Sequence, residues 1–133
     1  MQCSQYAHYV AAAPVGIHYR LVDLDLPMPV HRVYAHEKVQ DDRGKVALMR
    51  GPIVDCLEAV DHPGVDLSRV ALPRESNLSA EHRAGRLGGM TVLQGQALAD
   101  GQRPIALTAV PYYAWQNRGV HGMTVWILDR SNP

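Results

Sequence analysis

Hydrophobic and polar residues alternate in several short stretches of the chain, and these stretches predict β-strands. From residue 22 to residue 28 every second position is hydrophobic. This spacing is typical of a strand with one face in the core and the other in water. Pro27 and Pro29 lack a backbone donor, so we expect the strand to end or bend there. Further strands are expected at residues 30–39, 45–49, 53–60, 70–72, 91–98, 104–110 and 123–128.

Turn-forming residues separate these strands. Asp100-Gly101 lies between two hydrophobic runs and predicts a hairpin. Arg50-Gly51-Pro52 interrupts an apolar stretch, and it predicts a bulge or a corner. Residues 75–89 are polar and contain glycines, so we expect a long surface loop that could include one helical turn after Ser79.

Short strands, strong turns and the lack of a long amphipathic helix predict an all-β fold. An antiparallel β-sandwich or a jelly roll is the expected architecture, and a small α+β fold is the alternative. The 133 residues suit one domain. We expect an irregular amino-terminal segment at residues 1–15 and the β-domain at residues 16–133.

Composition and charge narrow the classes of partner. Hydrophobic residues make up 47% of the chain and charged residues 20%, as in a globular protein. Thirteen basic and thirteen acidic side chains cancel without a charged run, so we expect neither nucleic acid nor a membrane surface as partner. The amino terminus lacks the basic region of a signal peptide, and two cysteines do not make a disulfide framework. These features predict a cytoplasmic protein with reduced thiols.

Metal and cofactor sites are not predicted. The seven histidines lack the paired spacing of zinc ligands, and His31 and His36 should face opposite sides of a strand. The glycines of residues 85–89 are too few and follow no strand, unlike a dinucleotide-binding fingerprint. We therefore expect no metal ion and no cofactor.

Catalytic roles are weighed for one cysteine and several carboxylates. Cys56 lies in an apolar strand without a neighbouring cation, which favours an inert core thiol over a nucleophile. Asp55, Glu58 and Asp61 invite comparison with a glycosidase, but Asp55 and Glu58 should point to opposite faces of one strand. Solvation at a strand edge is the favoured interpretation, and no catalytic residue is assigned.

Aromatic residues gather near the carboxy terminus. Tyr112, Tyr113 and Trp115 could stack on a sugar or on another protein, or fill a core in a chain that has no phenylalanine. Core or interface packing is favoured, and carbohydrate contact is the alternative. Asn117 and Arg118 offer several donors, and we expect them to tie the last loop to backbone carbonyls.

Three segments together resemble a known family. They are DLDLPMPV at residues 23–30, KVALMRGPIVDCLE at residues 45–58, and VPYYAWQNRG at residues 110–119 followed by MTVWI. This combination, with Arg50-Gly51-Pro52 and Tyr112-Tyr113-Ala114-Trp115 in order, resembles the carboxy-terminal β-sandwich region of glycoside hydrolase family 127, the β-L-arabinofuranosidase-like family. The resemblance covers nearly the whole chain, although Asp55 stands where the family usually has tyrosine.

The resemblance implies an accessory role rather than catalysis. In that family a preceding (α/α)-barrel holds the active site, with a zinc-bound cysteine as nucleophile. Cys56 does not match that cysteine, so no catalytic residue carries over. The first hypothesis is a non-catalytic accessory domain that packs on a separately encoded catalytic barrel. The alternatives are a carbohydrate-binding or protein-interaction module that uses Tyr112, Tyr113 and Trp115, and a homodimer formed through exposed strand edges.

Overall fold

The regular structure of the chain is almost entirely β-strand. The computed structural model describes residues 7–9 and 22–130. Its strands are β1 (Ala7–Tyr9), β2 (Val22–Leu24), β3 (Val30–Tyr34), β4 (Lys45–Arg50), β5 (Ile53–Glu58), β6 (Val70–Pro73), β7 (Ser79–Arg83), β8 (Met90–Ala99), β9 (Arg103–Pro111), β10 (Met123–Thr124) and β11 (Ile127–Arg130). Single turns of 3-10 helix are η1 (Gln40–Asp42), η2 (Ala59–Asp61), η3 (Leu67–Arg69) and η4 (Tyr112–Ala114). The predicted all-β class is confirmed. Within the described residues, no helix has the length and hydrophobicity needed to span a membrane.

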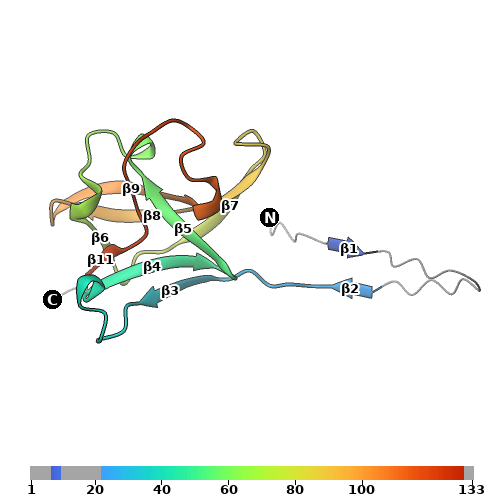
Figure 1. The fold of residues 1–133 in the computed structure, drawn as a ribbon, viewed down its shortest axis with the longest axis horizontal. Coiled ribbons are helices and arrows are strands. Elements are labelled where there is room, and N and C mark those ends of the chain that lie inside the picture. Colours follow the sequence, from blue (N-terminus) through green and yellow to red (C-terminus); the bar gives the residue numbers. More distant parts are fainter. Residues whose placement is uncertain (1–6, 10–21, 131–133) are drawn as a thin grey trace, which may run out of the picture.

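Six strands close into a barrel, in the order β4, β5, β9, β8, β6 and β11, with β11 returning to β4 (Figure 1). All pairs in this ring are antiparallel except β11 with β6. The arrangement therefore differs from the expected sandwich or jelly roll. A barrel and a sandwich share short strands and frequent turns, so the local sequence pattern does not separate them. The difference lies in the β11 pairings, which join strands far apart in the sequence.

Several strands lie outside the ring. β3 pairs with β4, β7 with β8, and β10 with β5. β7 falls within the stretch expected to be a loop, and that expectation is wrong for Ser79–Arg83. β1 pairs with β2 beside the barrel (Figure 1), and it lies within the segment expected to be irregular. The rest of that segment, like the boundary proposed after residue 15, is outside the described residues.

The barrel interior is the main hydrophobic core. Ten buried residues form it: Val46, Leu48, Leu57, Val70, Leu72, Leu93, Ala97, Leu107, Ala109 and Ile127. A second cluster packs outside the barrel wall beneath η4 and consists of Cys56, Met90, Val92, Val110 and Ala114. Leu57 belongs to the first cluster and Cys56 to the second, because successive strand residues point to opposite faces. β5 is therefore buried on both sides, and this burial positions the polar groups at its end.

The Asp100-Gly101 hairpin matches the sequence prediction, whereas Arg50-Gly51-Pro52 forms a hairpin turn instead of the expected bulge or corner. Gly51 and Pro52 connect β4 to β5, with Arg50 paired to Ile53. Gly51 has a φ of +55°, which suits the first position of a type II′ hairpin turn. Asp100 and Gly101 both have positive φ at the end of the β8–β9 hairpin.

Candidate functional site

Two carboxylates lie at the end of β5 and at the end of η2, and little of either is exposed. Glu58 is fully buried, and the side chain of Asp61 is 11% exposed. Arg118 donates hydrogen bonds to both groups, at 2.6 and 2.7 Å to the two oxygens of Asp61 and through Nη2 to Oε2 of Glu58. These residues are 57 and 60 positions apart in the sequence. The guanidinium thereby fixes the loop after η4 against the end of β5.

Further donors complete this cluster. The Gln116 N–H donates to Oε1 of Glu58 at 3.0 Å, and Nε2 of His121 lies 2.9 Å from the same oxygen. Arg86, in the loop between β7 and β8, donates to Asp61. We call Glu58, Asp61, Arg86, Arg118 and His121 the ion cluster. It joins three separate segments of the chain.

The ion cluster keeps both carboxylates charged. Burial by itself would raise the pKa of Glu58, but hydrogen bonds from Gln116, Arg118 and His121 outweigh it and hold that pKa below its usual value. Burial is likewise outweighed at Asp61, where hydrogen bonds from Arg118 and Arg86 lower the pKa. The bond to Asp61 in turn raises the pKa of the Arg118 guanidinium. The expected strand-edge solvation is therefore wrong for Glu58 and Asp61, because Glu58 is buried, the Asp61 side chain is only 11% exposed, and both are paired.

His62 is a buried residue next to the ion cluster, and its ring links two strands. Its Nε2 accepts from the Thr108 N–H at 3.2 Å, so its Nδ1 carries the proton and donates to the Glu58 carbonyl at 2.8 Å. The imidazole thus joins β5 to β9 just beyond the end of their ladder at Leu57 and Ala109. Both ring nitrogens are used in this contact.

The aromatic segment, for which the sequence favours core or interface packing over sugar contact, lies on η4 and the residue that follows it, and its two tyrosines are not in the core. Tyr112 is 48% exposed and Tyr113 is 66% exposed, whereas Trp115 is half-buried and stacks on Tyr112 with ring centroids 6.0 Å apart. Asn117 donates to the Ala114 carbonyl at 3.1 Å and closes the turn. Arg118 binds the two carboxylates instead of the backbone carbonyls expected from sequence.

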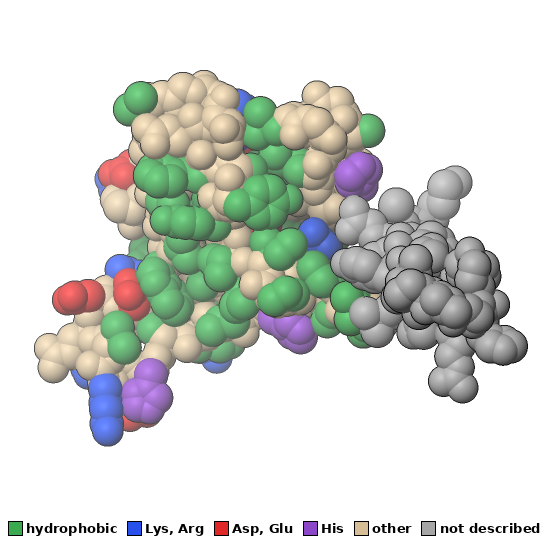
Figure 2. Space-filling model, turned by 45° about the vertical axis from the view of Figure 1, so that its right-hand side comes forward, with side chains coloured by type: hydrophobic (Ala, Val, Ile, Leu, Met, Phe, Trp, Pro, Cys, Tyr) green, Lys and Arg blue, Asp and Glu red, His purple; other side chains and the backbone are tan. Residues whose placement is uncertain are grey.

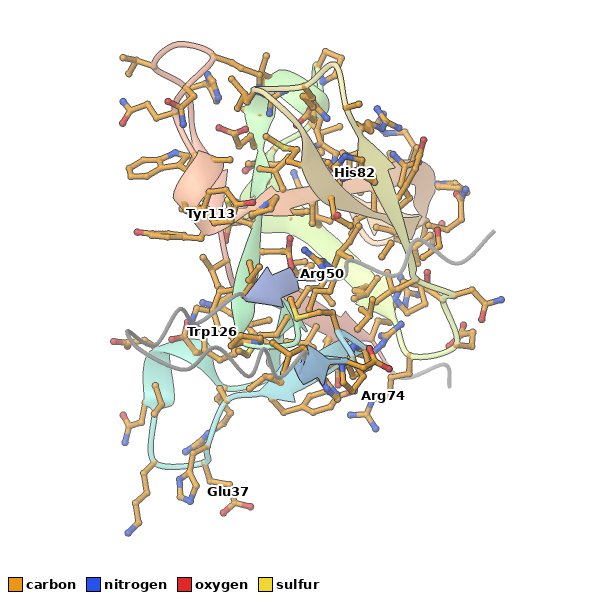
Figure 3. The ribbon with its side chains drawn as sticks, turned by 90° about the vertical axis from the view of Figure 1, so that its right-hand side faces the viewer. Glu37, Arg50, Arg74, His82, Tyr113 and Trp126 are labelled. Atoms are coloured by element: carbon orange, nitrogen blue, oxygen red, sulfur yellow. The ribbon has the colours of Figure 1, made fainter. Side chains whose placement is uncertain are left out.

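A hollow of about 290 Å³ opens beside this segment. It is lined by Leu87, Gly89, Met90, Tyr113, Ala114 and Asn117. Figure 3 shows Tyr113 on the outside of the molecule and Arg50 enclosed among the strands. The lining is mostly apolar, with one amide and one phenol as its side-chain hydrogen-bonding groups. These features suit contact with another surface rather than chemistry on a substrate.

A second hollow, of about 640 Å³, lies in the other half of the molecule, near Glu37 and Arg74 (Figure 3). It is also bordered by Tyr34, Arg43 and Lys45. Arg74 forms a salt bridge with Asp129 at 2.5 Å, and its guanidinium carbon lies 5.7 Å from the Tyr34 ring centre. Lys45 donates to the Asp41 carbonyl and to Asp42. The charges around this hollow are thus largely paired within the domain.

Cys56 is buried beneath η4. It is 1% exposed, and burial raises the pKa of its thiol to about 12, with Glu58 and Asp55 adding to the effect. The thiol is therefore protonated at neutral pH, which makes it a poor nucleophile. Within the described ranges, no three His, Cys, Asp or Glu side chains are arranged to hold a metal ion.

The remaining motif residues lie at the turn between β4 and β5. Arg50 ends β4 and is 8% exposed, and Gly51 and Pro52 form the turn.

The ion cluster was not predicted as a unit, since its acidic and basic members are distant in sequence. The sequence feature that came nearest to indicating the ion cluster was the short spacing of Glu58 and Asp61 at the end of one strand.

Comparisons with known proteins assign the chain to a family. Residues 30–128 match the model of the glycoside hydrolase family 127 C-terminal domain. A non-reducing end β-L-arabinofuranosidase from Bifidobacterium longum subsp. longum is 35% identical, over 79% of this chain and 19% of the relative.

Solved structures agree with this match. A GH127 β-L-arabinofuranosidase from Geobacillus stearothermophilus T6 superposes with a TM-score of 0.67 and 37% identity, over 84% of this chain and 21% of that one. A second GH127 β-arabinofuranosidase gives a TM-score of 0.69 and 25% identity, over 99% of this chain and 25% of the other. The chain spans a fifth to a quarter of the length of these relatives. It belongs to the family of glycoside hydrolase family 127 C-terminal domains.

Proposed function

We propose that this chain is a non-catalytic accessory domain, which supports the rest of a family 127 glycosidase through a protein–protein contact. The observation that carries the proposal is the match of residues 30–128 to the C-terminal domain alone, within relatives that are four to five times longer. The partner is either covalently continuous or a separately encoded catalytic barrel.

The chemistry of the polar residues supports the same role. Glu58 is hydrogen-bonded by Arg118, Gln116 and His121, and Asp61 by Arg118 and Arg86. Both keep their charge, whereas a general acid needs a raised pKa and access to substrate. The Cys56 thiol is buried and protonated. Each group that resembles a catalytic residue is thus used in holding the fold.

A chimera tests this function. In the Geobacillus β-L-arabinofuranosidase, the matched C-terminal region is replaced by this chain, and a second version has the region deleted. We expect the chimera to be folded and to hydrolyse an aryl β-L-arabinofuranoside, the deletion to be unstable, and this chain alone to show no turnover. Hydrolysis by the isolated chain, lost in a Cys56→Ser variant, would refute a non-catalytic role.

A carbohydrate-binding module is the second candidate. The exposure of Tyr112 and Tyr113 favours it, because rings buried in the core could not stack on a sugar. Titration of the chain with arabinose-containing oligosaccharides, followed by the fluorescence of Trp115 and Trp126, tests this candidate. Saturable binding that a Tyr113→Ala variant loses would support it over the accessory role.

A further inference from the structure

Exposed hydrophobic side chains gather on the three segments that the ion cluster joins. Val60 of η2 is 46% exposed, Leu87 of the β7–β8 loop is 46% exposed, and Val120 is 90% exposed. Tyr112 and Tyr113 of η4 are exposed as well. These five make up half of the large hydrophobic side chains exposed in the described residues. Figure 2 shows hydrophobic side chains on the surface of the molecule, and the identity of the five comes from their exposure.

The members of the ion cluster are sequence neighbours of these exposed side chains. Val60 precedes Asp61, Leu87 follows Arg86, and Val120 lies between Arg118 and His121. Arg86 and Arg118 both donate to Asp61, so the three segments share one carboxylate. Loops at a surface are usually mobile, and ordering them on binding costs free energy. The cluster orders them in advance, which is the arrangement expected of a preformed contact surface.

The hollow of about 290 Å³ lies between two of these segments. Leu87 borders it from the β7–β8 loop and Tyr113 from η4. A cavity of about 150 Å³ accommodates a benzene ring, so this hollow has room for one large side chain. A sugar ring would bring hydroxyls around its whole edge and would find the Asn117 amide and the Tyr113 hydroxyl as side-chain partners. An aliphatic or aromatic side chain therefore fits the lining better than a sugar.

We propose that Val60, Leu87, Tyr112, Tyr113 and Val120 form a docking face for the remainder of a family 127 glycosidase, with one apolar side chain of that partner inserted into the hollow. This inference rests on the proposed accessory function and specifies its contact surface. About four-fifths of the length of the matched relatives lies outside the region that this chain covers, so a large partner surface exists in those proteins. Tyrosines such as Tyr112 and Tyr113 are enriched in protein interfaces.

Variants of the chimera test the docking face. Leu87→Asp and Tyr113→Asp each place a charge at the hollow, and we expect limited proteolysis to release the grafted domain about tenfold faster than from the parent chimera. Tyr34→Asp is the matched control, because Tyr34 is 49% exposed and borders the other hollow. The control should leave the release rate unchanged. Melting curves of the three variants in the isolated chain check that each keeps the fold, and we expect only small shifts because these side chains are about half exposed or more.

The outcomes separate the two proposals. A folded, active chimera whose release rate is the same with and without Leu87→Asp and Tyr113→Asp would overturn the docking face and leave the accessory function in place. A chimera no more stable than the deletion would overturn the accessory function itself, and the docking face with it. Saturable binding of an arabinose-containing oligosaccharide at the hollow, lost with Tyr113→Asp, would replace the protein partner with a sugar.

Discussion

Asp55 and Arg50 both point into the barrel interior beside the Gly51–Pro52 turn, yet the Asp55 carboxylate accepts no hydrogen bond from Arg50. Asp55 is paired with Leu48 and lies two positions from Leu57, and both of these belong to the inner core. Both Asp55 oxygens and Nε of Arg50 are buried without a hydrogen-bond partner in the described part of the chain. Burial raises the pKa of Asp55 to about 7, although the charge of Arg50 opposes this shift.

The stability of the domain should therefore fall as the pH rises from about 4 to 7. The carboxyl has an ordinary pKa of 3.8 in the unfolded chain, so over this range the folded state alone retains the proton. The stabilisation is complete below the unfolded value and is lost as the pH passes the folded value near 7. The difference corresponds to roughly 4 kcal/mol as an upper bound. Urea unfolding at pH 5 and pH 8 measures the part lost above pH 5, about 2.7 kcal/mol of that upper bound.

Asp55→Asn is the control for this pH dependence. The amide is isosteric and does not titrate, so we expect the variant to be more stable than the natural chain at pH 8 and to lose most of the difference between pH 5 and pH 8. Glu58 and Asp61 stay ionised across this window because their pKa values are lowered. Equal unfolding free energies for the natural chain at pH 5 and pH 8 would contradict the burial of a protonated Asp55.

Arg118 should be the most important single side chain of the ion cluster. Arg118→Met leaves Glu58 buried with one fewer counter-charge, and we expect a loss of about 3 kcal/mol in unfolding free energy. Glu58→Gln added to this variant should recover part of the loss by removing the buried charge. Arg69→Met is the matched control, since its partner Asp100 is exposed and such pairs contribute about 0–1 kcal/mol. Equal losses in the two single variants would refute a structural role for the cluster.

Gly51 is constrained by its backbone and by a neighbour. A Cβ at this position would overlap the sulfur of Met28, and the positive φ also disfavours other residues. Gly44 has a φ of +74°, but a Cβ added there would have no atom within 4 Å, so Gly44→Ala reports the backbone cost alone. We expect Gly51→Ala to be more destabilising than Gly44→Ala by up to about 1 kcal/mol, because the flexible end of Met28 must move aside, and Met28→Ala to remove that excess. Thermal unfolding of the two glycine variants, of Met28→Ala and of the Gly51→Ala/Met28→Ala double variant measures these differences.

The parts of the fold that depend on neighbouring residues were predictable from sequence. Asp100-Gly101 has the residues that a hairpin with two positive φ angles requires, and β8 and β9 are where the pattern placed them. β7 was missed because Ser79–Arg83 is polar and exposed along most of its length. Its extended conformation comes from pairing with β8 rather than from its own hydrophobic pattern.

The candidate site was predictable only in part, because it too depends on contacts between residues that are distant in the sequence. Alternation placed Asp55 and Glu58 on opposite faces of β5, as observed, but it could not show that each face is covered. The burial of Glu58 depends on Arg118, 60 residues away, and barrel closure depends on β11 reaching β4 and β6. Such pairings follow from the assembled fold and leave no local signal.

Cys56 provides a direct test of the packing beneath η4. In a Cys3→Ser variant it is the one remaining thiol of the chain. With a pKa of about 12 and 1% exposure, the thiol should react with an aromatic disulfide reagent at pH 8 at least about 100-fold more slowly in the folded than in the unfolded protein. Absorbance of the released thiolate, followed from 0 M guanidinium to beyond the unfolding midpoint, measures this ratio. Reaction in the folded protein within a few-fold of the unfolded rate would mean that η4 does not cover the thiol, and it would reopen the question of a nucleophilic Cys56.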